Sequence, residues 1–387
     1  MRILDIRERS IALSRYADPA IASGGLTTSL VAVVTDQQRD GRPVIGYGFG
    51  SIGRFAQAGL IRERFMPRLL AAPAEDLLTA AGDNLDPAGC WRVMMQDEKP
   101  GGHGERCVAV GALDMAIWDA AAKIGGQPLY RFLATASGRS LQAAPSVPLY
   151  ASGGYPYPAD DTRRLGEEIR HFLGLGYRRV KIKIGAATPD QDLRRIDAVL
   201  KLLPSSDCLA VDAMNRYDAA TAVEMARQLS ALDLMWSEDL CDPLDFATQA
   251  EIAVRHAPPL AVGEALFSVA ETRLLLRHGG LRPARDILLF DPAHCYGLTH
   301  YLQIIATCEA AGWARRAFWP HGGHLFSLQV AAGLGLGGSE VNPRAFYPIG
   351  GLVPAQALID GAAMPPDLPG IGLESRPDLL RLFNELS

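Results

Sequence analysis

A short run of alternating residues decides the fold: Arg179-Val180-Lys181-Ile182-Lys183-Ile184-Gly185. Side chains of a strand alternate between its two faces, so both lysines lie on one face and the aliphatic residues on the other. A helix-like stretch follows this run. Five further apolar runs come after it, each ending in a polar residue and followed by another helix-like stretch, at intervals of 26–30 residues.

The polar residues that end these six runs share one position in the repeat. They are Lys183, Asp212, Glu238, Glu264, Asp291 and His321. About 30 residues accommodate one strand and one crossover helix, and consecutive units of this kind form a parallel sheet. We therefore predict an α/β fold with a (β/α)-barrel, a modified TIM barrel, over residues 131–350. All six side chains would lie at its C-terminal rim, where such barrels hold their chemistry.

The repeat also predicts the individual barrel elements. The first strand is expected at 147–150 and the eighth, which has the weakest pattern, at 344–348. Helices are expected at 160–173, 189–203, 219–229, 245–256, 269–278, 298–311 and 325–334.

The segment before the barrel has a different pattern. Residues 27–35 and 43–50 are typical of antiparallel strands, and Asp40-Gly41 supplies a turn between them. Helical patterns follow at 59–70, 73–81 and 106–124. We predict an α+β capping domain over residues 1–130, completed by a C-terminal segment, residues 351–387, that packs back on it.

The composition is that of a soluble enzyme. The 387 residues are 48% hydrophobic, and 38 basic and 43 acidic residues give a net charge of −5, which argues against a nucleic-acid partner. None of the six cysteines forms a CxxC pair, so we expect reduced thiols and a cytoplasmic location. No signal-peptide pattern is present, and no stretch approaches the roughly 20 apolar residues of a membrane span.

Three of the rim residues suit a hard cation. Asp212, Glu238 and Glu264 end successive strands, and magnesium prefers oxygen ligands of this kind. Any one of them alone is as readily a helix-capping acid. Together, at equal spacing beside two lysines, they predict a magnesium site.

The remaining rim residues suit proton transfer. Lys181 and Lys183 face the barrel interior, and a neighbouring lysine and a metal would both favour a neutral amine, so Lys183 is the expected base. Asp291 can orient the imidazole of His321 and fix its tautomer. His294 and His324 are weaker candidates for that histidine. These groups predict removal of the proton next to a substrate carboxylate, with magnesium stabilising the resulting enediolate.

A glycine-rich loop at 98–106 precedes one predicted helix. Its Lys99 and His103 are candidate substrate-binding residues that reach the rim from the other domain. The alternative is a mobile surface loop.

The chain resembles the enolase superfamily, and within it the mandelate racemase group. The residues that carry the resemblance are the Lys-x-Lys strand, the three acidic residues, the Asp291–His321 pair and the Pro-His-Gly-Gly-His sequence at 320–324. It looks closest to the D-tartrate dehydratases. The resemblance implies that Lys183 is the base and His321 the acid, that Asp212, Glu238 and Glu264 bind Mg²⁺, and that Lys99 contacts substrate.

Four positions depart from that pattern. Met214 stands where the resemblance implies asparagine, with the substrate-binding candidate Asn215 next, and Ala265, Gly25 and Ile52 replace other polar residues. We therefore expect a small hydroxy-carboxylate substrate less uniformly polar than tartrate.

The expected activity is dehydration by a homo-oligomeric carbon–oxygen lyase. The alternatives are a racemase or epimerase that uses the same residues and a non-catalytic oligomeric scaffold.

Overall fold

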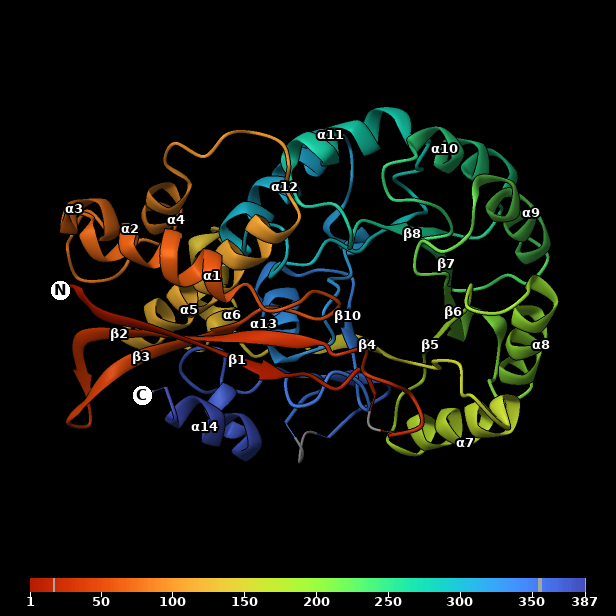
Figure 1. The fold of residues 1–387 in the computed structure, drawn as a ribbon, viewed down its shortest axis with the longest axis horizontal. Helices are drawn as coiled ribbons and strands as arrows, with labels where there is room; N and C mark the ends of the chain where they lie inside the picture. Colours follow the sequence, from red (N-terminus) through yellow and green to blue (C-terminus); the bar gives the residue numbers. More distant parts are fainter. Residues whose placement is uncertain (17, 354–356, 387) are drawn as a thin grey trace.

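The centre of the molecule is a curled parallel sheet surrounded by helices (Figure 1). The computed structural model describes residues 1–16, 18–353 and 357–386. The strands pair in the order β10-β4-β5-β6-β7-β8-β9. They are β4 (Val147–Gly153), β5 (Val180–Lys183), β6 (Leu209–Asp212), β7 (Trp236–Glu238), β8 (Leu260–Val262), β9 (Ile287–Leu288) and β10 (Ser339–Val341).

Backbone hydrogen bonds close this sheet into a barrel. The Trp319 N–H donates to the Leu288 carbonyl at 3.0 Å, which joins β9 to the segment before His321. The Gly337 N–H donates to the Phe318 carbonyl at 3.0 Å, which joins the same segment to the start of β10. Strand β10 then pairs in parallel with β4. The predicted barrel is confirmed.

The eighth strand was predicted in the wrong place. It is β10, Ser339–Val341, rather than residues 344–348. This strand contains a single apolar residue, Val341, and lies between the turn-like sequences Gly337-Gly338 and Asn342-Pro343, whereas the equally short β7 and β8 lie within longer apolar runs.

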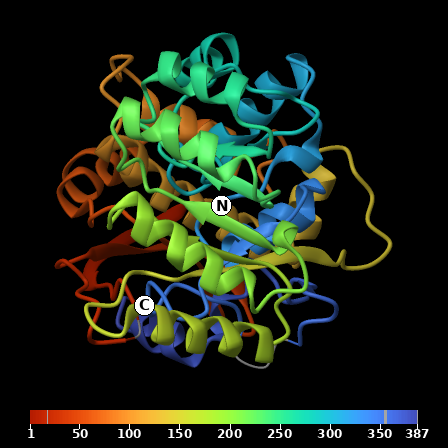
Figure 2. The ribbon, with the colours of Figure 1, turned by 90° about the vertical axis from the view of Figure 1, so that its right-hand side faces the viewer.

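The helices lie outside the strands, as Figure 2 shows from the barrel side. They are α7 (Asp161–Gly174), α8 (Pro189–Leu200), α9 (Ala219–Leu229), α10 (Phe246–Arg255), α11 (Val269–His278), α12 (Leu298–Ala310) and α13 (Leu325–Leu334). Each matches a predicted helix within a few residues. Caps explain several starts: Thr188 and Ser268 form capping boxes for α8 and α11.

The N-terminal part is an antiparallel sheet covered by helices. The sheet has the order β1 (Ile3–Ala12), β2 (Thr27–Arg39) and β3 (Arg42–Phe49). The helices are α1 (Ala58–Leu60), the π-helix η1 (Ile61–Phe65), α2 (Met66–Ala71), α3 (Ala74–Leu77), α4 (Pro87–Met95), α5 (Glu105–Ile124) and α6 (Leu129–Ala136). The predicted strands are confirmed, whereas α4 was not predicted. Among the described residues, no helix is long and apolar enough to cross a membrane.

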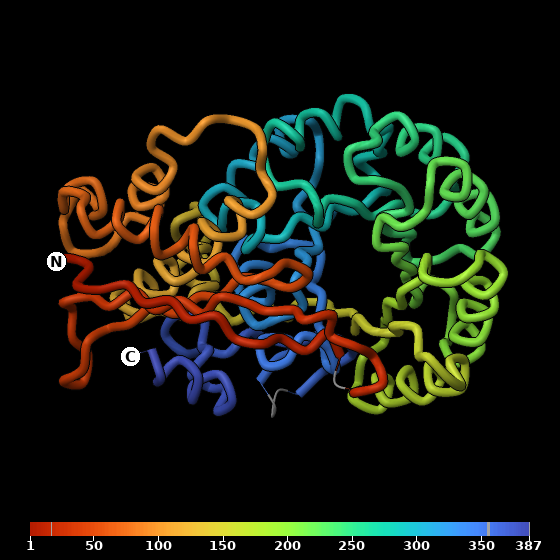
Figure 3. Tube along the Cα trace, viewed as in Figure 1, coloured from red at the N-terminus to blue at the C-terminus, as the bar shows by residue number. Residues whose placement is uncertain are grey.

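The C-terminal segment returns to this sheet (Figure 3). It contains β11 (Ala362–Ala363) and α14 (Pro377–Asn384). The ring of Phe383 stacks on Tyr47 of β3 with centroids 4.5 Å apart. The buried Asp119 carboxylate of α5 accepts hydrogen bonds from the N–H groups of both Tyr47 and Ile371. The capping domain is thus completed by the end of the chain, while the boundaries at 130 and 350 stay predictions.

Helix α5 joins the capping domain to the barrel at one close contact. A Cβ built on Gly111 would lie 1.7 Å from the Ala293 carbonyl oxygen, so only glycine fits there. In the same contact, the buried Asp114 accepts hydrogen bonds from the hydroxyl and the N–H of Thr299, at the start of α12. The loop that carries Asp291 is therefore held against α5.

We predict that Gly111→Ala destabilises the protein. The added methyl group collides with backbone that cannot move aside as a flexible side chain would, and overpacking of this kind costs about 1–3 kcal/mol. Urea unfolding of the purified variant measures the loss. Gly59→Ala is the matched control, because Gly59 also lies in a helix but has open space around its Cβ, and this variant should unfold at or above the wild-type midpoint. An unchanged midpoint for Gly111→Ala would contradict the prediction.

Candidate active site

Three carboxylates meet at the C-terminal end of the barrel strands. Asp212 and Glu238 end β6 and β7 and are paired in register. Glu264 follows β8 by two residues. One oxygen from each lies within 4.8 Å of the others, so the three can bind a single cation. Asp212 and Glu238 are fully buried, whereas the side chain of Glu264 is 22% exposed.

Both lysines of β5 contact these carboxylates. The Lys181 ammonium lies 2.5 Å from Glu238 Oε1 and 3.6 Å from Asp212 Oδ2. Lys183 donates a hydrogen bond to Asp212 Oδ2. Burial lowers the pKa of Lys183, and Lys181 lowers it further, as expected from the sequence, but the Asp212 carboxylate outweighs both and raises the pKa above its ordinary value. In this arrangement Lys183 is an ammonium.

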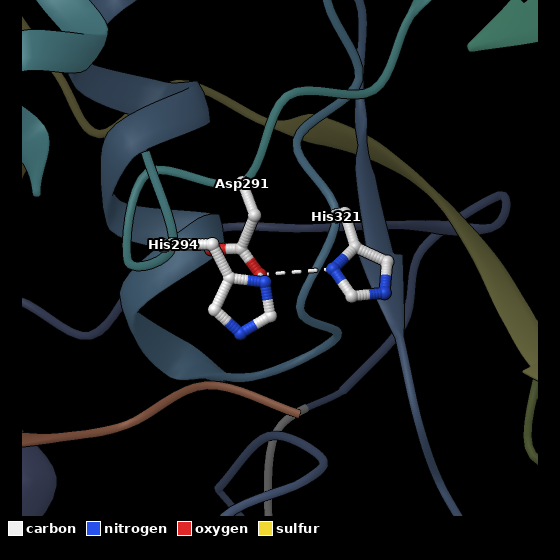
Figure 4. A group of neighbouring side chains, drawn as sticks. All are labelled: Asp291, His294 and His321. Atoms are coloured by element: carbon white, nitrogen blue, oxygen red, sulfur yellow. Dashed lines mark hydrogen bonds and ion pairs between the residues drawn. The ribbon is translucent and has the colours of Figure 1, made fainter. Parts of the chain in front are cut away.

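Asp291 and His321 form a hydrogen-bonded pair (Figure 4). His321 Nδ1 lies 2.8 Å from Asp291 Oδ2, and its Nε2 lies 3.2 Å from Glu264 Oε2. Burial lowers the pKa of His321, but the nearby Glu264, Glu340 and Asp291 raise it to about 10. The ring is therefore protonated near neutral pH and faces the three-carboxylate cluster through Nε2.

Asp291 is itself held by the capping domain. Ser51, which follows β3, donates a hydrogen bond of 2.7 Å to Asp291 Oδ2. His324 Nε2 lies 3.0 Å from the Ser51 hydroxyl, and its Nδ1 accepts from the Ser327 N–H at 3.3 Å, which places the ring proton on Nε2. Sequence reasoning did not find Ser51, because 240 residues separate it from Asp291.

Glu340 on β10 is a second residue that sequence reasoning missed. Its Oε1 lies 3.2 Å from the Lys181 ammonium, and its Oε2 accepts from the Gly322 N–H at 3.0 Å and lies 3.9 Å from His321 Nε2. Like Asp212 and Glu238, it lies in a barrel strand and is buried. The misplaced eighth strand concealed it, although Ser339-Glu340-Val341 has a polar residue between small or apolar ones.

A cavity of about 200 Å³ opens on these groups. Its inner lining includes Lys183, His321, Glu264 and Glu340. Further lining residues come from the capping loops and the loop after β6: Arg15, Leu26, Ile52, Gly53, Arg54, Met214 and Arg216. Other barrel-domain residues complete the lining: Ser152, Tyr155, His294, Asn342 and Phe346. Of the four departures noted in the sequence, Met214 and Ile52 line this cavity, and Gly25 and Ala265 do not.

The predicted substrate-binding residues lie elsewhere. Lys99 is exposed, and His103 Nδ1 contacts the Tyr296 hydroxyl at 2.9 Å. Asn215 donates its side-chain amide to the Cys241 carbonyl at 2.7 Å, because Met214 and Asn215 both have positive φ and turn the chain. None of the three lines the cavity among the described residues. Their substrate-binding role stays a prediction.

The family follows from the sequence of the barrel. A family model described as "Enolase C-terminal domain-like" matches residues 164–379, more than half of the chain. The chain belongs to the enolase superfamily. In this superfamily member the match covers every barrel strand from β5 to β10, and so all the rim residues described above.

Relatives cover nearly the whole chain. Arabinonate dehydratase from Saccharolobus solfataricus is 26% identical over 380 residues, which are 97% of each chain. L-talarate/galactarate dehydratase from Salmonella typhimurium is 27% identical over 310 residues, 79% of this chain and 70% of that one. A racemase from Streptomyces coelicolor A3(2), solved with bound magnesium, superposes with a TM-score of 0.76 at 23% identity and covers 99% of both chains.

The three-carboxylate cluster of this enolase-superfamily chain suits magnesium. Its donors are all oxygens. Glu264 Oε2 lies 3.2 Å from His321 Nε2 but accepts no hydrogen bond of good geometry among the described residues, so it is available as a ligand for a cation. Against the effect of burial, Lys183 and Lys181 hold the pKa of the Asp212 carboxyl below its ordinary value, whereas burial raises the pKa of Glu238 to about 8 despite its contact with Lys181. A cation bound there would favour the ionised form of Glu238, as ligation requires.

We predict that magnesium raises the thermal midpoint of the wild-type protein and that Glu264→Gln weakens this effect. Binding to the folded state alone stabilises it by mass action. Loss of one charged ligand should raise the magnesium Kd by about tenfold or more, or about 1.4 kcal/mol. Isothermal titration calorimetry measures it. Glu251→Gln, in an exposed pair with Arg255, is the control and should bind magnesium as the wild type does. Equal affinities in all three proteins would exclude this site.

Proposed function

We propose that the protein is a magnesium-dependent dehydratase of an acid sugar. The observation that carries this proposal is the shared cavity, in which a lysine and a histidine lie beside the three-carboxylate cluster. The relatives named above that dehydrate arabinonate and talarate or galactarate support loss of water from a sugar acid.

The reaction assigns a separate step to each residue. Lys183 accepts the proton from the carbon next to the substrate carboxylate, and the electron pair of that C–H bond forms an enediolate. His321, protonated on Nε2, donates its proton to the hydroxyl on the next carbon, whose C–O bond breaks to release water. The enol product then becomes a 2-keto acid. Magnesium bound to Asp212, Glu238 and Glu264 would supply positive charge beside the substrate carboxylate.

Two contacts would prepare these groups. Asp291 fixes the tautomer of His321 and favours its protonated form, because the carboxylate lies 2.8 Å from Nδ1. Lys183 must be neutral to accept a proton, so its hydrogen bond to Asp212, which favours the ammonium form, must first be broken. Ligation of Asp212 by the cation would compete with this hydrogen bond and so lower the pKa of the lysine.

Racemisation with the same pair is the second candidate. It would exchange protons on the two faces of the α-carbon, and no water would leave. Mass spectrometry of a substrate after turnover separates the two reactions, because only dehydration lowers the mass by that of water.

A library of hydroxy acids, assayed for 2-keto acid formation, tests the proposed function. We expect at least one sugar acid to give product and D-tartrate to have a lower kcat/KM than the best substrate. Met214 and Ile52 leave part of the cavity apolar, and a buried hydroxyl without a partner costs about 1–3 kcal/mol. If D-tartrate is the best substrate, this interpretation of the pocket is wrong; if no acid gives product, dehydration is wrong.

We predict that Lys183→Ala abolishes turnover. General base catalysis contributes about 10²- to 10⁴-fold, so product formation should fall by at least that factor. Exchange of the α-proton with solvent deuterium should vanish with it, as NMR would show. Lys201→Ala, which removes an exposed lysine, is the control and should keep full activity. Exchange at the wild-type rate in Lys183→Ala would show that another group is the base.

We predict that Asp291→Asn lowers turnover by about 10- to 100-fold without changing magnesium affinity. Removing a negative charge 2.8 Å from the ring lowers the pKa of His321. The protonated histidine is the active form, so the basic limb of the kcat profile should move to lower pH. A large loss of magnesium binding with an unmoved pH profile would instead make Asp291 a metal ligand.

A further inference from the structure

Three arginines line the active-site cavity from three separate segments. Arg15 comes from the loop after β1, Arg54 from the loop after β3, and Arg216 from the loop after β6. Arg216 is exposed and the other two are half-buried, whereas Lys183 and His321 are buried. The arginines therefore line the solvent side of the cavity, and the reacting groups line its inner end.

No carboxylate of the described residues forms an ion pair with these arginines. In the part of the chain that the structure describes, none of the three makes an ion pair or a side-chain hydrogen bond, and Arg54 only packs over the Phe267 ring at 4.9 Å. Other arginines of the same region are paired: Arg62 with Glu8, and Arg164 with Asp18. A guanidinium presents five donors suited to carboxylate or phosphate oxygens, so three of them on one cavity form a strong anion site.

We infer that this side of the cavity binds a second anionic group, which makes the substrate a dianion with its second charge at the end remote from the reacting carbon. The inference rests on the proposed function and narrows its substrate class. A terminal carboxylate and a terminal phosphate share the required chemistry. The relatives leave the choice open, because arabinonate has one carboxylate and galactarate has two.

Matched substrates test the inference. The library would hold each sugar acid in three forms: the aldonate, the corresponding aldarate, and the aldonate with a terminal phosphate. We expect the best dianion to exceed its aldonate in kcat/KM by about tenfold or more. That advantage should shrink as the salt concentration rises, because exposed charges are screened. The preferred dianion identifies the source of the charge, carboxylate or phosphate.

Arginine variants assign the effect to these residues. Arg15→Gln, Arg54→Gln and Arg216→Gln should each lower kcat/KM for the dianion by about 10-fold or more and lower that for the aldonate by a smaller factor. Arg344→Gln is the control, because Arg344 packs over Tyr16 and lies outside the cavity lining. Equal kcat/KM for aldonates and dianions, or equal losses on both in all three variants, would overturn the inference. Absence of product from every sugar acid would instead refute the proposed function.

An unpaired nitrogen at the inner end carries an independent inference. His294 is 2% exposed, lines the cavity, and has its ring centre 5.9 Å from that of His321. Its Nδ1 faces Asp291 Oδ2 at 3.4 Å, while its Nε2, on the far side of the ring in Figure 4, has no hydrogen-bond partner among the described residues. Burial lowers the pKa of this ring to about 4, so it is neutral. The proton lies on Nδ1, which faces the Asp291 carboxylate, and this leaves a lone pair on Nε2.

We propose that His294 Nε2 accepts a hydrogen bond from a substrate hydroxyl close to the reacting carbons. His294→Phe should lower kcat/KM by about tenfold or more, and His294→Gln, which keeps an acceptor, should lower it less. A set of deoxy substrate analogues locates the hydroxyl. One analogue should be a poorer substrate than the parent acid for the wild-type protein, whereas His294→Phe should turn over this analogue and the parent acid equally. Equal losses for Phe and Gln, or further losses on every analogue, would overturn the proposal. Wild-type unfolding midpoints and magnesium affinity would show that both variants fold.

Discussion

The rim of this barrel depends on the neutralisation of buried charge. Lys181 has no exposed surface, and its ammonium contacts Glu238, Glu340 and Asp212, which come from three different strands. Removing one partner of a buried pair typically costs about 3–5 kcal/mol, because the other charge is left uncompensated. The lysine therefore fixes the positions of three carboxylates at once. Two of the three candidate magnesium ligands, Asp212 and Glu238, are therefore held by a residue that does not itself line the cavity.

The capping domain and the barrel share the reaction centre unequally. The barrel supplies the groups proposed to bind metal and move protons, which lie at the ends of its parallel strands or in the segments that follow them. The capping loops supply Arg15 and Arg54 on the solvent side of the cavity and the buried Ile52. The reacting groups of the barrel and the substrate-recognising groups of the capping loops can change independently only while the two domains keep the same relative position. The tight contact of Gly111 with Ala293 maintains that register close to Asp291.

How much the sequence predicted depends on the range of each interaction. The barrel, most of its helices and the positions of Lys183, Asp212, Glu238, Glu264, Asp291 and His321 followed from a local pattern, namely polar residues at the ends of regularly spaced strands. Glu340 was missed because β10 has one apolar residue and lies between Gly337-Gly338 and Asn342-Pro343, a sequence that predicts a turn rather than a strand. Ser51 and the three arginines depend on how the capping domain docks, which no local pattern encodes. The direction of the Asn215 side chain depends on two successive residues with positive φ, Met214 and Asn215. Methionine rarely adopts this conformation, so the sequence did not predict it.

The loop at 50–54 links two properties that would otherwise evolve separately. Ser51 donates to Asp291, which holds the proposed proton donor, and Ile52 and Arg54, its near neighbours, line the cavity. Replacing this loop to change substrate preference would also remove the hydrogen bond from Ser51 to Asp291, the residue that positions His321. Changes in this loop therefore affect both the acidity of His321 and the preference for substrate. In laboratory evolution of the protein, we expect substitutions in the loop to occur in pairs rather than singly.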